Sequence, residues 1–119
     1  MHARSERLRE LYLEELSRAL PSVKDPGLKG FLTLTGVELS EDGKRASVYY
    51  SILGSAQEKK AAARALERAA PYLRQVLRKR LTVKFLPEFS FVYDDTPRKA
   101  SLVDKMLLRI ERERQDRGT

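Results

Sequence analysis

The chain has 119 residues, a mass of 13.7 kDa and no cysteine. This length fits one domain with a modest core, and 41% hydrophobic with 34% charged residues is typical of a globular protein. The lack of cysteine excludes disulfides, thiolate metal sites and thiol catalysis, and favours the cytosol. No apolar run approaches the roughly 20 residues that span a bilayer, and there is no signal-peptide pattern. We therefore expect a cytoplasmic protein without a membrane partner.

The net charge of +7 is concentrated in one stretch of the chain. Between Glu58 and Lys84, nine basic residues accompany two acidic ones, which leaves the rest of the chain neutral. A basic surplus confined to one helical segment is typical of a nucleic-acid surface, although a solvated helix face is the alternative. We predict that phosphate contacts are made by these residues: Arg74, Arg78, Lys79 and Arg80, supported by Lys59, Lys60, Arg64, Arg68 and Lys84.

The first half of the chain predicts a helix followed by a hairpin. Residues 5–20 carry apolar side chains at helical spacing, and Pro21 ends the helix. Residues 31–39 and 45–53 alternate as two strands joined by an Asp-Gly turn, with Gly36 as the site of a bulge. Alternation of this kind predicts an antiparallel sheet with one packed face, covered by helices in a two-layer α+β domain.

The central stretch predicts two helices that meet at a kink. Ser55 and Glu58 have the spacing of a capping box, which begins the first helix. Pro71 lacks an amide donor, and in a helix interior it costs roughly 3 kcal/mol, whereas it is well tolerated as the first residue of a helix. We therefore predict an interhelical kink at Ala69, Ala70 and Pro71, with Pro71 opening the second helix.

The last part predicts a strand and a helix. Residues 88–94 form the third strand, on which Phe89, Phe91 and Tyr93 share one face. Core packing is the favoured interpretation of these aromatic residues, and base stacking is the alternative. Residues 101–114 predict a final helix. We expect a domain of residues 1–108 and a polar, frayed tail of residues 109–119.

No catalytic or metal site can be assembled from these residues. The one histidine, His2, lies at the terminus. Asp94 and Asp95 are adjacent carboxylates beside a turn, where aspartate is commonly a local cap; a hard-cation site or an acid–base pair is the alternative. We expect no enzyme activity, no cofactor and no metal. Residues 27–30 read Gly-x-x-Gly, the pattern of a nucleic-acid clamp in KH domains, but that loop joins two helices and this one precedes a strand.

The order helix, strand, strand, helix, helix, strand, helix resembles the type II KH arrangement, with a three-stranded sheet. Five stretches in the right order resemble the ribosome-binding factor A family: residues 4–20 followed by 24–26, then 33–40, 46–54, 69–81 and 87–95. In that family an interhelical kink of the form Ala-x-Gly replaces the Gly-x-x-Gly loop. The chain matches it at Ala69 and departs from it at Pro71.

The resemblance implies a non-enzymatic assembly factor of the bacterial small ribosomal subunit. Such proteins bind the immature subunit, assist maturation of small-subunit rRNA, including its 5′ end, and matter for growth in the cold. We expect the small subunit and its rRNA as partners, and a monomer when free. The alternatives are a general KH-type RNA- or DNA-binding module, and a protein-interaction domain that binds no nucleic acid.

Overall fold

The computed structural model describes residues 2–28, 31–94, 109–110 and 112. Its elements in chain order are α1 (His2–Ala19), the short 3-10 helices η1 (Leu20–Ser22) and η2 (Pro26–Leu28), β1 (Phe31–Leu39), β2 (Arg45–Leu53), α2 (Ala56–Arg80) and β3 (Glu88–Tyr93). Residues 109, 110 and 112 are helical. The rest of the predicted final helix and tail lies outside the described residues, so the boundary expected at residue 108 stays a prediction.

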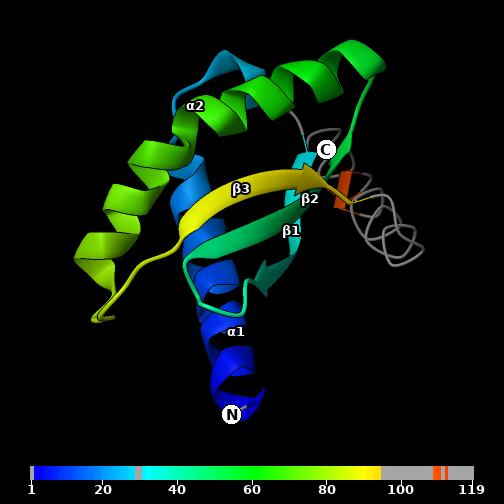
Figure 1. The fold of residues 1–119 in the computed structure, drawn as a ribbon. Coiled ribbons are helices and arrows are strands. Elements are labelled where there is room, and N and C mark those ends of the chain that lie inside the picture. Colours follow the sequence, from blue (N-terminus) through cyan, green and yellow to red (C-terminus); the bar gives the residue numbers. More distant parts are fainter. Residues whose placement is uncertain (1, 29–30, 95–108, 111, 113–119) are drawn as a thin grey trace.

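The three strands form one sheet in the order β1-β2-β3 (Figure 1). The hairpin of β1 and β2 is antiparallel, as predicted, and its register shifts between Leu34 and Gly36, next to the expected bulge. The turn is also as predicted, because Gly43 has a φ of 72° and its amide donates to the carbonyl of Ser40.

The sheet is mixed rather than wholly antiparallel, which corrects the prediction. β3 pairs with β2 in parallel, so that Arg45 lies opposite Glu88 and Tyr50 opposite Tyr93. A parallel pair requires a crossover, and α2 supplies it by carrying the chain back to the end of the sheet where β2 begins. Alternation along β2 showed which face is buried, but it held no information about the direction of β3.

Both long helices pack on one face of the sheet, which gives the two-layer α+β, type II KH-like arrangement. α1 contacts mainly β1, and α2 contacts β3 and η2. In the view of Figure 1, α1 lies behind the sheet and α2 runs along the side of β3. The aromatic residues of β3 face the core, as predicted: Phe89 is buried and forms a T-shaped pair with the Tyr12 ring, with centroids 5.7 Å apart, and Phe91 and Tyr93 pack partly buried against the core. The core combines residues of α1 (Tyr12, Leu16, Ala19), β2 (Ala46, Val48, Tyr50) and α2 (Leu66, Ala69, Leu73, Leu77).

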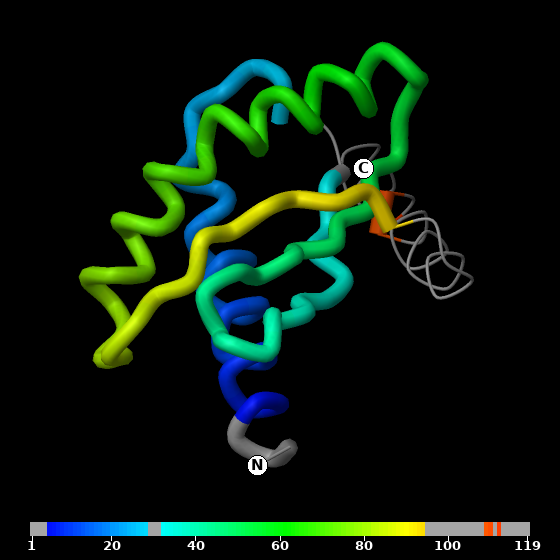
Figure 2. The backbone as a smooth tube through the Cα atoms, in the orientation of Figure 1, coloured from blue at the N-terminus to red at the C-terminus, as the bar shows by residue number. Residues whose placement is uncertain are grey.

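The prediction of two helices meeting at Ala69, Ala70 and Pro71 is wrong. α2 is one helix of 25 residues with Pro71 inside it. Leu66 and Leu73, on either side of the proline, are fully buried. Full burial of each leucine stabilises the fold by about 1.5–3 kcal/mol, which together offsets the roughly 3 kcal/mol cost of the proline. The helix is not straight, since Figure 2 shows that it changes direction along its length. An interior proline is a usual cause of such a bend.

Candidate nucleic-acid interface

Helix α2 presents the candidate surface because it is strongly amphipathic. Its start is fixed by the predicted capping box: the Glu58 amide donates to Ser55 Oγ (3.2 Å), and the Ser55 amide donates to Glu58 Oε1 (3.1 Å). The amide of Ser55 lowers the pKa of Glu58, because it donates to the ionised carboxylate. The apolar side of α2 is buried against η2 and the sheet, so its charged residues are left on the outer side.

Four exposed cations form what we call the basic surface of α2: Lys60, Arg64, Arg78 and Lys79. Lys60 and Arg64 are four residues apart, and Arg78 follows Lys60 after about five turns of 3.6 residues, so these three side chains lie along one side of the helix. Within the described part of the chain, none of the four forms an ion pair or a side-chain hydrogen bond. Their charges are therefore available to an external anion.

Arg68 is bound within the protein. Its Nε and Nη2 atoms donate to Oδ2 and Oδ1 of Asp25, each at 3.0 Å. The pKa of the Asp25 carboxyl is lowered, first by Arg68 and then by the Gly27 amide that also donates to it. The pKa of Arg68 is raised by the same pairing. This cation therefore holds the connector of residues 20–28 against α2.

Arg74 also has an internal role, at the other end of the helix. It is half-buried, and its Nη2 and Nε atoms donate to the backbone carbonyls of Leu86 (2.8 Å) and Pro87 (3.1 Å). These two hydrogen bonds fix the chain between α2 and β3. Since a guanidinium has five donor hydrogens, Arg74 retains capacity for a further contact, but its position is determined by the fold.

The remaining three predicted cations have weaker internal contacts. Arg80 Nη1 lies 3.6 Å from Glu15 of α1. Lys59 Nζ lies 5.4 Å from the centre of the Tyr93 ring, and Lys84 Nζ lies 5.6 Å from that of Phe85. The nine predicted residues thus separate into four open cations and five with internal contacts. Sequence spacing could not show this, because partners such as Asp25 and Leu86 come from other elements.

A groove of about 390 Å³ lies between the second half of α2 and β3, beside the basic surface. Arg74, Gln75 and Arg78 line it on the helix side, and Glu88 and Ser90 line it on the strand side. Ala70, Pro71 and Phe89 also line it, so its walls mix polar and apolar side chains, and Glu67 and Glu88 offset its two arginines. No sequence pattern indicated this groove, because it depends on how β3 lies against α2.

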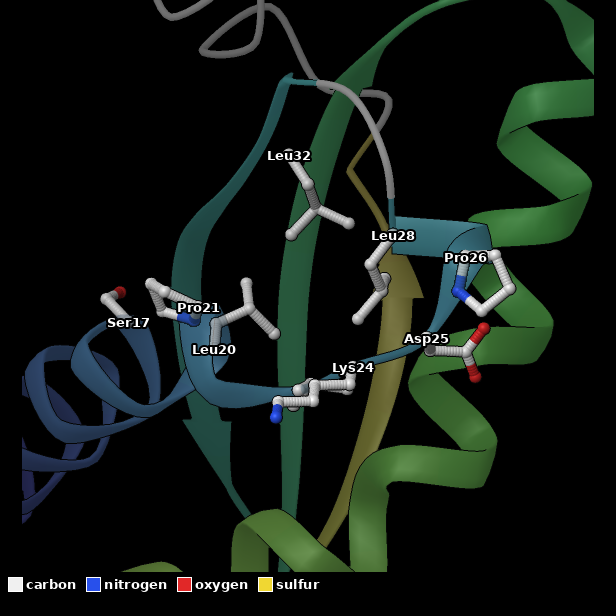
Figure 3. Close-up of a pocket in the computed structure, with 9 residues that line it drawn as sticks. Ser17, Leu20, Pro21, Lys24, Asp25, Pro26, Leu28 and Leu32 are labelled. Carbon is white, nitrogen blue, oxygen red and sulfur yellow. The ribbon is translucent and has the colours of Figure 1, made fainter.

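A second hollow, of about 550 Å³, lies between the connector, the end of α1 and β1 (Figure 3). Leu20, Leu28 and Leu32 form its apolar wall, whereas the carboxylate of Asp25 turns away from them toward α2. That orientation agrees with the ion pair to Arg68. The walls combine apolar side chains with one lysine and one engaged carboxylate, which is not a catalytic arrangement.

Asp94, for which the sequence suggested a local cap, makes a structural contact with a distant part of the chain. Asp94 is buried, and its Oδ2 atom accepts a hydrogen bond from Thr35 at 2.6 Å. Asp95 lies outside the described residues. Among the residues that the structure describes, no group of three or more His, Asp or Glu side chains could hold a metal. No helix in the described part combines the length and apolar character required to cross a membrane.

Comparison with known proteins identifies the family. The ribosome-binding factor A family profile matches residues 4–107. The chain is 36% identical to the ribosome-binding factor A of Geobacter sulfurreducens. The 115 aligned residues cover 96% of this chain and 97% of the relative. It is also 30% identical to the crystal structure of that factor from Thermus thermophilus, with a TM-score of 0.67 over 75% of this chain and 93% of the other.

The chain belongs to the ribosome-binding factor A family. A further similar structure is a Thermus thermophilus ribosome binding factor A homology model fitted into a cryo-EM map of a 30S complex. It is 31% identical, with a TM-score of 0.60, and the match covers 71% of this chain and 88% of the other. The family resemblance inferred from the five sequence stretches is thereby confirmed.

Proposed function

We propose that this protein is an assembly factor of the bacterial small ribosomal subunit. The observation that carries the proposal is the similarity, over most of the chain, to a ribosome-binding factor A fitted into a 30S complex. The open cations on α2 supply a physical means of binding, since each phosphate that a cation neutralises releases counterions. The protein binds the immature subunit in the cytoplasm as a monomer, and its action is non-enzymatic.

The basic surface of α2 binds the rRNA backbone in this proposal. Arg78 has the planar fork that matches phosphate oxygens, Lys60 and Arg64 lie on the same side of the helix, and Lys79 is an exposed neighbour of Arg78. Backbone contacts give affinity and orientation but no base sequence, so specificity comes from the shape of the ribosomal site. Binding there assists maturation of small-subunit rRNA, including its 5′ end, and supports growth in the cold.

Co-sedimentation tests the proposal directly. The full chain is centrifuged with purified small subunits, large subunits and assembled ribosomes, each at several salt concentrations. We expect the protein in the small-subunit fraction, most strongly with immature subunits, and less of it as salt rises. A general nucleic-acid-binding module would bind all three particles alike. A protein-interaction domain would bind with little dependence on salt.

A further inference from the structure

Phe85 is the most exposed large apolar side chain in the described part of the chain, with 73% of its surface accessible. It lies on the link between α2 and β3, just beyond the basic surface. A single exposed apolar residue is ordinary on a protein surface, so exposure alone indicates no site. Its surroundings differ from those of an ordinary surface residue in two respects: the backbone beneath it is anchored, and its neighbours are cationic.

The anchoring comes from contacts on the C-terminal side of Phe85. Arg74 donates to the carbonyls of Leu86 and Pro87, the two residues that follow. Pro87 is fully buried, and the amide of Glu88 donates to the carbonyl of Lys44 at 2.9 Å. The link is therefore fixed to α2 and to the β1–β2 turn. A ring carried on an anchored backbone costs less backbone ordering when it binds a partner than one on a mobile loop would.

Cationic side chains line both hollows beside Phe85. One, of about 310 Å³, is lined by Phe85 together with Arg78 and Lys84. The other, of about 570 Å³, is lined by Phe85 together with Lys44 and Arg45. The second hollow is also lined by Arg74, Asp42 and Glu88, so its three cations lie beside two carboxylates and it is less positive than the first.

We propose that Phe85 is a stacking platform for an unpaired base of RNA. Proteins recognise single-stranded RNA by pairing an aromatic face for the base with cations for the backbone, and this surface holds both. Arg78 belongs to the basic surface of α2 and to the hollow beside Phe85, so one strand of RNA reaches both. Lys84, whose Nζ lies 5.6 Å from the ring centre, binds a neighbouring phosphate. That this RNA is rRNA rests on the proposed function.

The test uses the full chain and a single-stranded RNA of about ten nucleotides that carries one fluorescent 2-aminopurine. The same sequence as a duplex is the reference ligand. Phe85→Ala removes the ring, Phe85→Leu keeps apolar bulk without a π face, and Phe85→Trp keeps the face. Val92→Ala is the matched control, because Val92 is another exposed apolar residue, on the strand that follows the link. Thermal melting confirms that each variant folds.

We expect Phe85→Ala and Phe85→Leu to weaken binding of the unpaired strand by about 5- to 150-fold and to abolish 2-aminopurine quenching. Phe85→Trp and Val92→Ala should bind as the wild type does. Duplex affinity and the salt slope should not change, because the ring carries no charge. A Phe85→Leu variant that binds like the wild type would show an apolar contact without stacking, as for a protein partner, and would overturn the proposal. Failure of the wild type to bind the unpaired strand would overturn it too.

The oligonucleotide experiment tests the stacking proposal, and co-sedimentation of the wild type tests the proposed function, so the two can fail independently. If the wild type sediments with small subunits but Phe85→Ala leaves the unpaired strand bound normally, only the stacking proposal fails. If Phe85→Ala lowers oligonucleotide affinity and the wild type does not sediment with small subunits, only the ribosomal assignment fails.

Discussion

Arg68 and Asp25, 43 residues apart, form a two-point ion pair that joins α2 to the connector of residues 20–28. Both hydrogen bonds measure 3.0 Å, and Asp25 is the more enclosed partner, with 15% of its side chain exposed. A second contact nearby links Ser22 Oγ to the hydroxyl of Tyr72 at 2.9 Å. A residue that composition assigns to the RNA surface is thus part of the structure that holds the domain together.

The ion pair predicts a pH dependence of stability. Hydrogen bonds from Arg68 lower the pKa of Asp25 in the folded state, so ionised Asp25 stabilises the fold above its unfolded pKa of about 3.9. That contribution is lost as the pH falls through the lower folded pKa. Asp25→Asn should therefore lower the melting temperature at neutral pH, and the difference from wild type should shrink below about pH 4. A difference that stays constant under acid would contradict the pairing, and Arg68→Gln should reduce the pH dependence.

Arg74 should matter for stability and Arg78 should not. Arg74→Gln removes two charged donors from the carbonyls of Leu86 and Pro87, which should lower the free energy of unfolding by about 1.5–3 kcal/mol. Arg78→Gln, four residues along the same helix, should stay within about 0.5 kcal/mol of wild type. Urea unfolding measures both. Equal stability of the two variants would show that the carbonyl contacts do not hold the link in solution.

Gly27 should not tolerate a side chain. A Cβ atom at this position would lie 2.6 Å from the Ala61 carbonyl oxygen and 2.9 Å from the Ala65 Cβ, and neither atom can rotate away. Gly27→Ala should destabilise the fold by about 1–3 kcal/mol in urea, through overpacking between η2 and α2. Gly43→Asn is the control, since the space around Gly43 is open and asparagine tolerates a positive φ. If Gly27→Ala leaves the free energy of unfolding unchanged, η2 lies farther from α2 in solution than in the structure.

The capping box should contribute measurably to stability. Ser55→Ala removes the oxygen that accepts from the Glu58 amide and should cost about 1 kcal/mol in urea unfolding. Gln57→Ala is a suitable control, because Gln57 is exposed in the same first turn. Alanine favours a helix more than glutamine does, so Gln57→Ala should not lose stability, and a Ser55→Ala variant as stable as Gln57→Ala would contradict a contribution from the cap.

The features that depend on residues close together in the sequence were predicted correctly. The bounds of β1 and β2, the Asp42–Gly43 turn, and the cap at Ser55 were all readable from the sequence, because each depends on residues a few positions apart. The core-facing side of β2 was readable for the same reason, since strand side chains alternate. These predictions agree with the structure.

Predictions that needed long-range partners were incomplete. The predicted helix break at Pro71 is wrong because the local free-energy cost of the proline is offset by the burial of Leu66 and Leu73. That burial depends on the position of the sheet, which local sequence does not specify. The grouping of Arg74 with Arg78 followed their shared helix face, but the carbonyl partners of Arg74 come from the link 12 and 13 residues farther on. The exposure of Phe85 also could not be inferred, because an apolar residue in a link is as readily buried.

The proposed RNA contacts of α2 are tested most directly by the salt dependence of small-subunit binding. The choice of residues follows from their partners: Arg78 and Lys79 are open, whereas Arg74 and Arg80 have internal contacts. Arg78→Gln combined with Lys79→Gln removes two charges from the basic surface. Arg9→Gln combined with Arg18→Gln removes two charges from α1, where both arginines pair with glutamates of the same helix.

We expect the α2 variant to bind small subunits more weakly and to flatten the plot of log affinity against log salt by up to about two units, one per lost phosphate contact. The α1 variant, with the same net charge, should keep the wild-type slope. Equal slopes for wild type and the α2 variant would contradict the assignment of rRNA binding to the basic surface of α2.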